Sequence, residues 1–244
     1  MTREFVMTTS WDDGSPLDLR VAELLSKYGL TGTFYVPFET GHPILSPVQV
    51  RALAAVFEVG AHTVHHVELP DVPNAIAHSE IRDSKHRLEE VTGRECETFC
   101  FPKGRFSKRH LPMLRDAGFR GARTVELLSL KRPVSINGLA MIPTTVQAYS
   151  HETFEYVRNS VRRRKLTNTL HFLRICGSET WEHLAVRALM KACEDGGVFH
   201  LWGHSWEIEA AGQWATFEGV LALMGRFKAR GVCVTNAGVC CYAA

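Results

Sequence analysis

The chain has 244 residues, 45% of them hydrophobic and 22% charged, with a formal net charge of +2. This length can bury a core large enough for one domain, and the near-neutral balance gives no reason to expect nucleic acid or an anionic membrane as a partner. No run of about 18 apolar residues is present, and the charged Arg3 and Glu4 leave no room for a signal peptide before the first polar motif. We therefore expect a single domain over residues 1–244, without a membrane span and in the cytoplasm.

Two kinds of segment alternate along the chain. Short runs rich in β-branched and aromatic residues are followed by segments whose apolar residues recur every three or four positions, and Asn137-Gly138 favours a hairpin turn. The alternation predicts an α/β fold with a mostly parallel sheet and helices outside it. We expect strands at 5–9, 31–36, 56–61, 97–101, 118–123, 130–134, 139–143, 198–202 and 232–235, and helices at 15–28, 46–57, 74–91, 107–117, 150–164, 178–194 and 213–229.

Polar clusters follow three of the expected strands. The first strand runs into the sequence SWDDG at 10–14, a later one into HTVHH at 62–66, and a third into Gly203-His204. Ligands of parallel α/β sheets gather at the carboxyl ends of the strands. The three clusters are therefore expected to meet in one site.

A carboxylate and two imidazoles form a suitable ligand set for a borderline divalent cation. Asp13, His62 and His66 supply this set, although His65 competes with His66 for the third position. We expect one such cation, zinc in the first instance, with cobalt, nickel or manganese as alternatives. Seven scattered cysteines, without paired spacing, indicate free thiols instead of a disulfide framework.

Such a cation would activate a bound water molecule beside an amide or ester carbonyl. Asp12, next to the ligand Asp13, is then the expected general base. A histidine on the opposite wall, His204, is the expected general acid that protonates the leaving group.

The motifs also carry a family resemblance. SWDDG, HTVHH, FPKG at 101–104 and GHS at 203–205 resemble, in order, the motifs of NodB-type polysaccharide deacetylases, the fourth carbohydrate esterase family. The resemblance covers nearly the whole chain and implies a deformed (β/α) barrel with mostly parallel strands. It implies Asp12 as base and Asp13 as a ligand, and its spacing favours His66 over His65.

The third motif of the family is where this chain departs from it. The resemblance implies that Pro102, Lys103 and Gly104 line the cleft, with the Lys103 N–H available to an oxyanion, but the Arg that precedes them in the family is Cys100 here. That Arg normally orients the catalytic Asp. We expect Arg123, at a neighbouring strand end, to replace it.

The last two motifs differ as well. Trp202 stands where the family has an apolar Leu at the acyl pocket, and the Asp and Trp of the fourth motif, of which the Asp normally tunes the acidic His, have no copy here. Trp202 and Trp206 are compatible with stacking on a sugar ring and equally with packing in the core. Glu207 and Glu209 are interpreted as part of a solvated loop or helix start, with binding of substrate hydroxyls as the alternative.

These features predict a hydrolase that removes an acetyl group from the amide nitrogen of an acetylated amino sugar, oligosaccharide or glycan precursor. Hydrolysis of a related non-sugar amide and a glycan-binding homologue without activity are the alternatives on the same fold. The two-histidine, one-carboxylate set also serves non-haem Fe(II) oxygenases, but their usual H-x-D spacing is absent.

Overall fold

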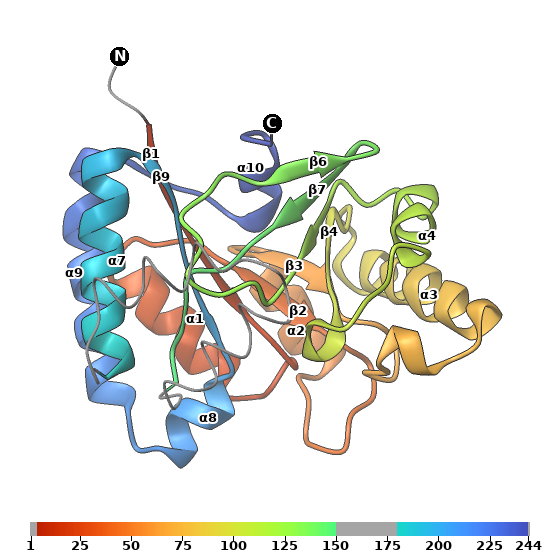
Figure 1. The fold of residues 1–244 in the computed structure, drawn as a ribbon. Helices are drawn as coiled ribbons and strands as arrows, with labels where there is room; N and C mark the ends of the chain where they lie inside the picture. The colour runs from red at the N-terminus through yellow and green to blue at the C-terminus, as the bar shows by residue number, and fades with distance from the viewer. Residues whose placement is uncertain (1–3, 150–179, 244) are drawn as a thin grey trace.

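The computed structural model describes residues 4–149 and 180–243. It has an α/β architecture in which a curled, mostly parallel sheet carries helices on its outer side, as the deformed barrel expected from the sequence requires (Figure 1). The helices form two groups, α1, α7 and α9 beside one part of the sheet and α2, α3 and α4 beside the other. The fold class expected from the sequence is confirmed.

The strands are β1 Phe5–Trp11, β2 Thr33–Val36, β3 Glu58–Ala61, β4 Thr98–Cys100, β5 Gly121–Arg123, β6 Val134–Ile136, β7 Leu139–Ile142, β8 Val146–Gln147, β9 Gly197–Gly203 and β10 Val232–Cys233. The helices are α1 Asp18–Lys27, α2 Pro47–Ala54, α3 Asn74–Thr92, α4 His110–Asp116, α7 Trp181–Asp195, α8 Ser205–Ala210, α9 Trp214–Phe227 and α10 Asn236–Cys240.

The strand order β6-β7-β5-β4-β3-β2-β1-β9-β8 places the two longest strands, β1 and β9, side by side along their whole length. The other edge of β1 is shared, because β10 pairs with its first half and β2 with its last two residues. β6 and β7 are antiparallel, and every other described pair is parallel. The carboxyl ends of β1, β2, β3, β4, β5 and β9 therefore lie at the same end of the curled sheet.

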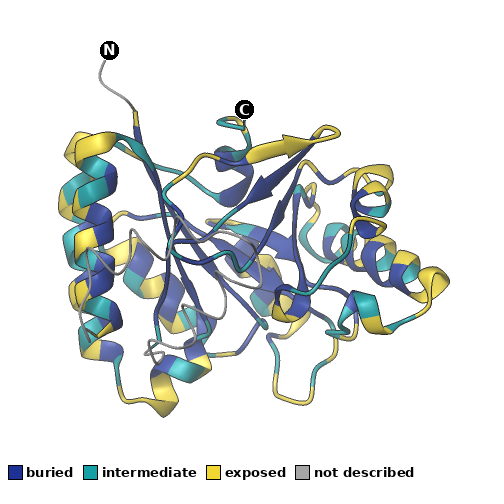
Figure 2. Cartoon of the chain, in the orientation of Figure 1, coloured by how far each residue is buried: buried dark blue, intermediate teal, exposed yellow. Residues whose placement is uncertain are grey.

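Local signals in the sequence explain several element boundaries. Ser46 and Gln49 form a capping box at the start of α2, and Gly93 ends α3 in the left-handed conformation. β1 is buried along all seven residues, in keeping with a strand covered on both faces (Figure 2). Its side chains and those of β9 anchor the main core cluster, against which α7 and α9 pack.

The hairpin forms at the expected turn, but its first strand is β6, at Val134–Ile136, and not 130–134. Asn137 and Gly138 both have positive φ, as a two-residue hairpin loop requires, and this turn pairs Ile136 with Leu139. Pro133 has no N–H to donate, so pairing stops there. Leu130 instead lies against β9, where its carbonyl accepts from the Val198 N–H at 3.0 Å.

Two short helices, α8 and α10, were not expected from the sequence. The expected helix at 150–164 lies outside the described residues, so the single domain over 1–244 stays a prediction. None of the six cysteines in the described residues forms a disulfide. No helix within residues 4–149 and 180–243 is long and apolar enough to cross a membrane.

Candidate active site

The residues expected to bind the cation come together beyond the ends of β1 and β3. The Nε2 atoms of His62 and His66 lie 3.5 and 3.2 Å from the same oxygen, Oδ1 of Asp13. One potential ligand atom from each side chain lies within 4.8 Å of the others. Oδ1 of Asp13 is buried without a hydrogen-bond partner, which fits a carboxylate oxygen whose partner is a cation.

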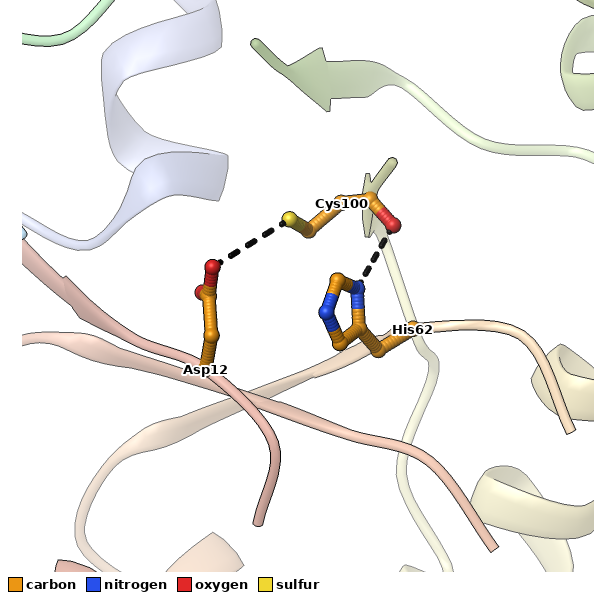
Figure 3. A group of neighbouring side chains, drawn as sticks. All are labelled: Asp12, His62 and Cys100. Atoms are coloured by element: carbon orange, nitrogen blue, oxygen red, sulfur yellow. Dashed lines mark hydrogen bonds between the residues drawn. The ribbon is translucent and has the colours of Figure 1, made fainter. Parts of the chain in front are cut away.

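Backbone contacts orient His62 toward this point. Nδ1 of His62 lies 2.8 Å from the carbonyl oxygen of Cys100, which can only accept, so the proton resides on Nδ1 and Nε2 is free to ligate (Figure 3). Metal-binding histidines are usually oriented in this way, by a hydrogen bond from the ring nitrogen that does not bind the metal. Asp13 itself has a positive φ of 75°, in the turn that follows β1.

Glu80, on α3, settles which neighbouring histidine faces the site. Its carboxylate accepts from the backbone N–H groups of Val64 and His65 at 2.8 and 3.0 Å and contacts Nδ1 of His65 at 2.5 Å. The His65 ring is thereby turned away from Asp13, while His66 is turned toward it. Glu80 carried no recognisable signal in the sequence, because its role depends on how α3 packs beneath this loop.

Asp12, the expected base, is paired with Arg123. The guanidinium contacts both carboxylate oxygens, and the two side chains are almost fully buried. Burial alone would raise the pKa of Asp12, but the positive charge of Arg123 above all, with that of His204, outweighs it and lowers that pKa. Arg123 therefore lies behind the carboxylate and holds it ionised, and it is not among the residues that line the cavity.

The register of the sheet explains how Arg123 reaches this position. Cys100 on β4 and Arg123 on β5 are direct partners in the parallel ladder. The sulfur of Cys100 is 3.8 Å from Oδ2 of Asp12 (Figure 3). This thiol is small, so the long side chain from the next strand can reach the same carboxylate. The guanidinium carbon also lies 4.6 Å from the ring centre of Trp202, a cation–π contact that supports it from the other side.

His204 lies across from Asp12, with Nε2 4.0 Å from Asp12 Oδ2 and 3.8 Å from Asp13 Oδ2. Its Nδ1 is 2.7 Å from Oε2 of Glu207, which also accepts from Gln147 Nε2 at 2.8 Å. Burial would lower the pKa of His204, but Glu207 above all, with Asp12, raises it to about 9. The imidazole is therefore a cation at neutral pH, with a proton on the nitrogen that faces the site.

Glu207, like Glu80, is a site residue whose contacts the sequence analysis did not predict. Interpreted there as solvated, it is instead partly buried in the first turn of α8, three residues after His204. The i, i+3 spacing from a histidine at the start of a helix is the signal that could have identified it, because such pairs share one face. Glu207 supplies the acidic partner for which the sequence offered no distant candidate.

The third-motif residues form a tight turn after β4. Lys103 and Gly104 both have positive φ, and a Cβ on Gly104 would meet the Val125 side chain at 2.1 Å. Lys103 lines the cavity and pairs through Nζ with Glu68 at 2.7 Å, whereas Pro102 and Gly104 are buried. Of these three, the side chain of Lys103 is the one placed to contact a ligand.

A cavity of about 940 Å³ unites these groups. Its polar lining includes Asp12, Asp13, His62, His66 and His204. Apolar side chains of Trp202, Val125 and Leu127 line it as well. A cavity of this size accommodates a small ligand with both polar and apolar parts.

Comparison with known proteins agrees with this geometry. The family model for polysaccharide deacetylases matches residues 1–122, half of the chain. The chain belongs to the polysaccharide deacetylase family. No individual curated protein sequence matches it.

Solved structures of this family share the fold at low identity. The chitin deacetylase of Colletotrichum lindemuthianum is 17% identical, with a TM-score of 0.61 over 100% of this chain and 90% of the other. The peptidoglycan N-acetylglucosamine deacetylase Bc1960 is 13% identical, with a TM-score of 0.61 over 98% and 89%. A mutant of BA3943, a CE4 family pseudoenzyme, is 14% identical, with a TM-score of 0.57 over 98% and 68%.

Proposed function

We propose that this deacetylase-family member is a metal-dependent hydrolase that removes an acetyl group from the amide nitrogen of an amino sugar, oligosaccharide or glycan precursor. The observation that carries the proposal is the convergence, in one cavity, of a three-residue ligand set with an ionised carboxylate and a protonated imidazole. Titratable groups whose environments drive their protonation states apart are typical of an acid and base pair.

The donor set fits a divalent cation of borderline character, and we propose zinc. A cation held by Asp13, His62 and His66 would polarise the substrate carbonyl and lower the pKa of a water molecule beside it. Asp13 is suited to this task, because the neighbouring imidazoles of His62 and His66 outweigh its burial and lower its pKa, so the carboxylate is anionic.

Asp12 accepts the proton of the attacking water. Its carboxylate is ionised because Arg123 lies against it, and the same contact fixes its orientation. The tetrahedral carbon that results carries a negative oxygen, which the backbone N–H of Lys103 is proposed to stabilise.

His204 completes the reaction. Its Nε2 carries the proton that the departing amine nitrogen needs, and the negative charge of Glu207 holds it there until transfer. The products are acetic acid, which ionises to acetate, and a free amine. Asp12 then releases its proton to solvent and His204 takes one up, which restores the starting state of both side chains.

The apolar side chains of Trp202, Val125 and Leu127 are proposed to receive the acyl methyl group. Two structural neighbours are a chitin deacetylase and a peptidoglycan N-acetylglucosamine deacetylase, which favours an N-acetylated amino sugar as the substrate. Cytoplasmic location stays a prediction.

The test is acetate release from a panel of N-acetylated sugars and simple amides. Release should require a divalent cation, stop with chelator, and fall at least about a thousandfold in Asp12→Asn, as for loss of a general base acting with a bound cation. Asp116→Asn, an exposed carboxylate at the end of α4, is the matched control and should leave release unchanged. Equal release by the wild type and Asp12→Asn, with both folded by circular dichroism, would reject Asp12 as the base.

A further inference from the structure

Trp206 combines exposure with a position at the site. It is 42% exposed, and among the exposed large apolar side chains of the described residues it alone lines the cavity. It stands in the first turn of α8, two residues after His204. An exposed aromatic ring that lines a ligand cavity presents an apolar face against which a ligand ring can pack.

The Trp206 indole is fixed by a hydrogen bond at its N–H edge. Its Nε1–H donates to Oδ2 of Asp13 at 3.2 Å. The ring centre is 5.3 Å from that of His204 and 6.4 Å from that of His42, to which it is nearly parallel at 26°. His42 comes from the exposed loop after β2, so the two rings come from different segments of the cavity wall.

We propose that Trp206 is a carbohydrate-binding residue whose exposed face stacks on a pyranose ring of the substrate, while its N–H positions Asp13 for the cation. The inference rests on the proposed function and extends it by placing a sugar ring beside the acid His204, in contact with α8 and flanked by His42.

The hydrogen bond to Asp13 is the physical reason for the proposed positioning role of Trp206. A carboxylate whose Oδ2 is held by an N–H donor has its other oxygen directed to a defined point, and Oδ1 is the atom that faces both histidines. Partners of this kind typically change metal affinity 10- to 100-fold when they are removed. The proposed sugar-binding role rests on the apolar face of a pyranose, whose C–H groups gain contact area on an aromatic ring.

Two substitutions separate the roles. Trp206→Phe keeps an aromatic face and removes the N–H, and Trp206→Leu removes both. Zn²⁺ affinity is measured by calorimetry with a competing chelator, and binding of the N-acetylated chitin tetrasaccharide is measured on metal-free protein, in which no acetyl group is released. Met190→Ala, an exposed apolar side chain of α7 outside the cavity, is the control for both measurements.

We expect Trp206→Phe to weaken Zn²⁺ binding about tenfold or more and to leave tetrasaccharide binding within about twofold. Trp206→Leu should weaken both, the tetrasaccharide by up to about tenfold. Unchanged Zn²⁺ affinity in Trp206→Phe would overturn the positioning role. Wild-type tetrasaccharide affinity in Trp206→Leu would overturn the sugar subsite alone, whereas failure of the proposed function would appear as no acetate release by the metal-loaded wild type.

Discussion

Replacing Glu207 with Gln tests the acid side of the mechanism with the smallest change of shape. The substitution keeps a group that can accept from Nδ1 of His204 and removes the negative charge at 2.7 Å. Since that carboxylate is the main reason why the pKa of His204 is raised to about 9, the pKa must fall in the variant. A carboxylate in contact moves a neighbouring pKa by about 1 to 3, which places the variant between about 6 and about 8.

The acid must carry its proton to act, so deacetylation is lost as the pH rises through the pKa of His204. The rate of acetate release, measured from pH 5 to pH 11, should fall near pH 9 in the wild type and at least about one pH unit lower in Glu207→Gln. At pH 8 the variant should be slower by about twofold if the pKa of His204 falls to about 8 and by about ninetyfold if it falls to about 6, and at pH 5.5 the two should be similar. Stability follows the same sign: because the folded pKa of His204 is raised above 6.5, its contribution is present below pH 6.5 and is lost as the pH rises through about 9.

Glu209→Gln is the matched control, because Glu209 lies on the same helix but contacts Trp214 and Arg20 and not His204. Its pH profile should coincide with that of the wild type. An alkaline limb that stays near pH 9 in Glu207→Gln would refute the assignment of Glu207 as the partner that keeps His204 protonated.

Three further variants probe the groups that hold the site in place. Arg123→Met should lower the free energy of unfolding by about 3 to 5 kcal/mol at pH 7, because it leaves the buried Asp12 carboxylate unpaired. Urea denaturation measures this change, and unchanged stability and turnover would show that the pair is dispensable. Exchanging the partners, as Cys100→Arg with Arg123→Cys, should restore at least part of the acetate release lost in Arg123→Cys alone, and no recovery would argue against equivalent positions. Glu80→Gln should weaken Zn²⁺ binding about tenfold by calorimetry, because the loop that carries His66 loses charged hydrogen bonds; wild-type affinity would limit Glu80 to a role in folding.

The fold was predictable because most of its signals are local. Strand and helix segments could be read from period and turn residues, and Ser46, Gly93 and Asn137 mark boundaries through backbone rules that need no tertiary context. The predicted boundary of β6 was wrong, because the bounds of this strand depend on its pairing with β7 across the hairpin. α8 and α10 are short, so neither offers enough turns for a periodic pattern.

The core of the site was also accessible from sequence, for a topological reason. Asp13, His62 and His204 follow separate parallel strands, and such strands deliver their carboxyl ends to one edge. Glu80 and Glu207 were not accessible in the same way. Their roles depend on the packing of α3 under a loop and on the turn of a short helix, and a glutamate on a helix is ordinarily solvated.

Arg123 shows where the limit lies. Its position at a strand end suggested that it replaces an arginine absent from position 100, but nothing local says which residue of β4 it faces. The facing residue depends on the register between β4 and β5, which pairs Cys100 directly with Arg123. We therefore expect that, at this level of the sheet, an arginine on either strand reaches Asp12 provided that the other residue is small. On this basis the positive charge beside the Asp12 carboxylate belongs to the strand pair, and a motif written along one strand does not include it.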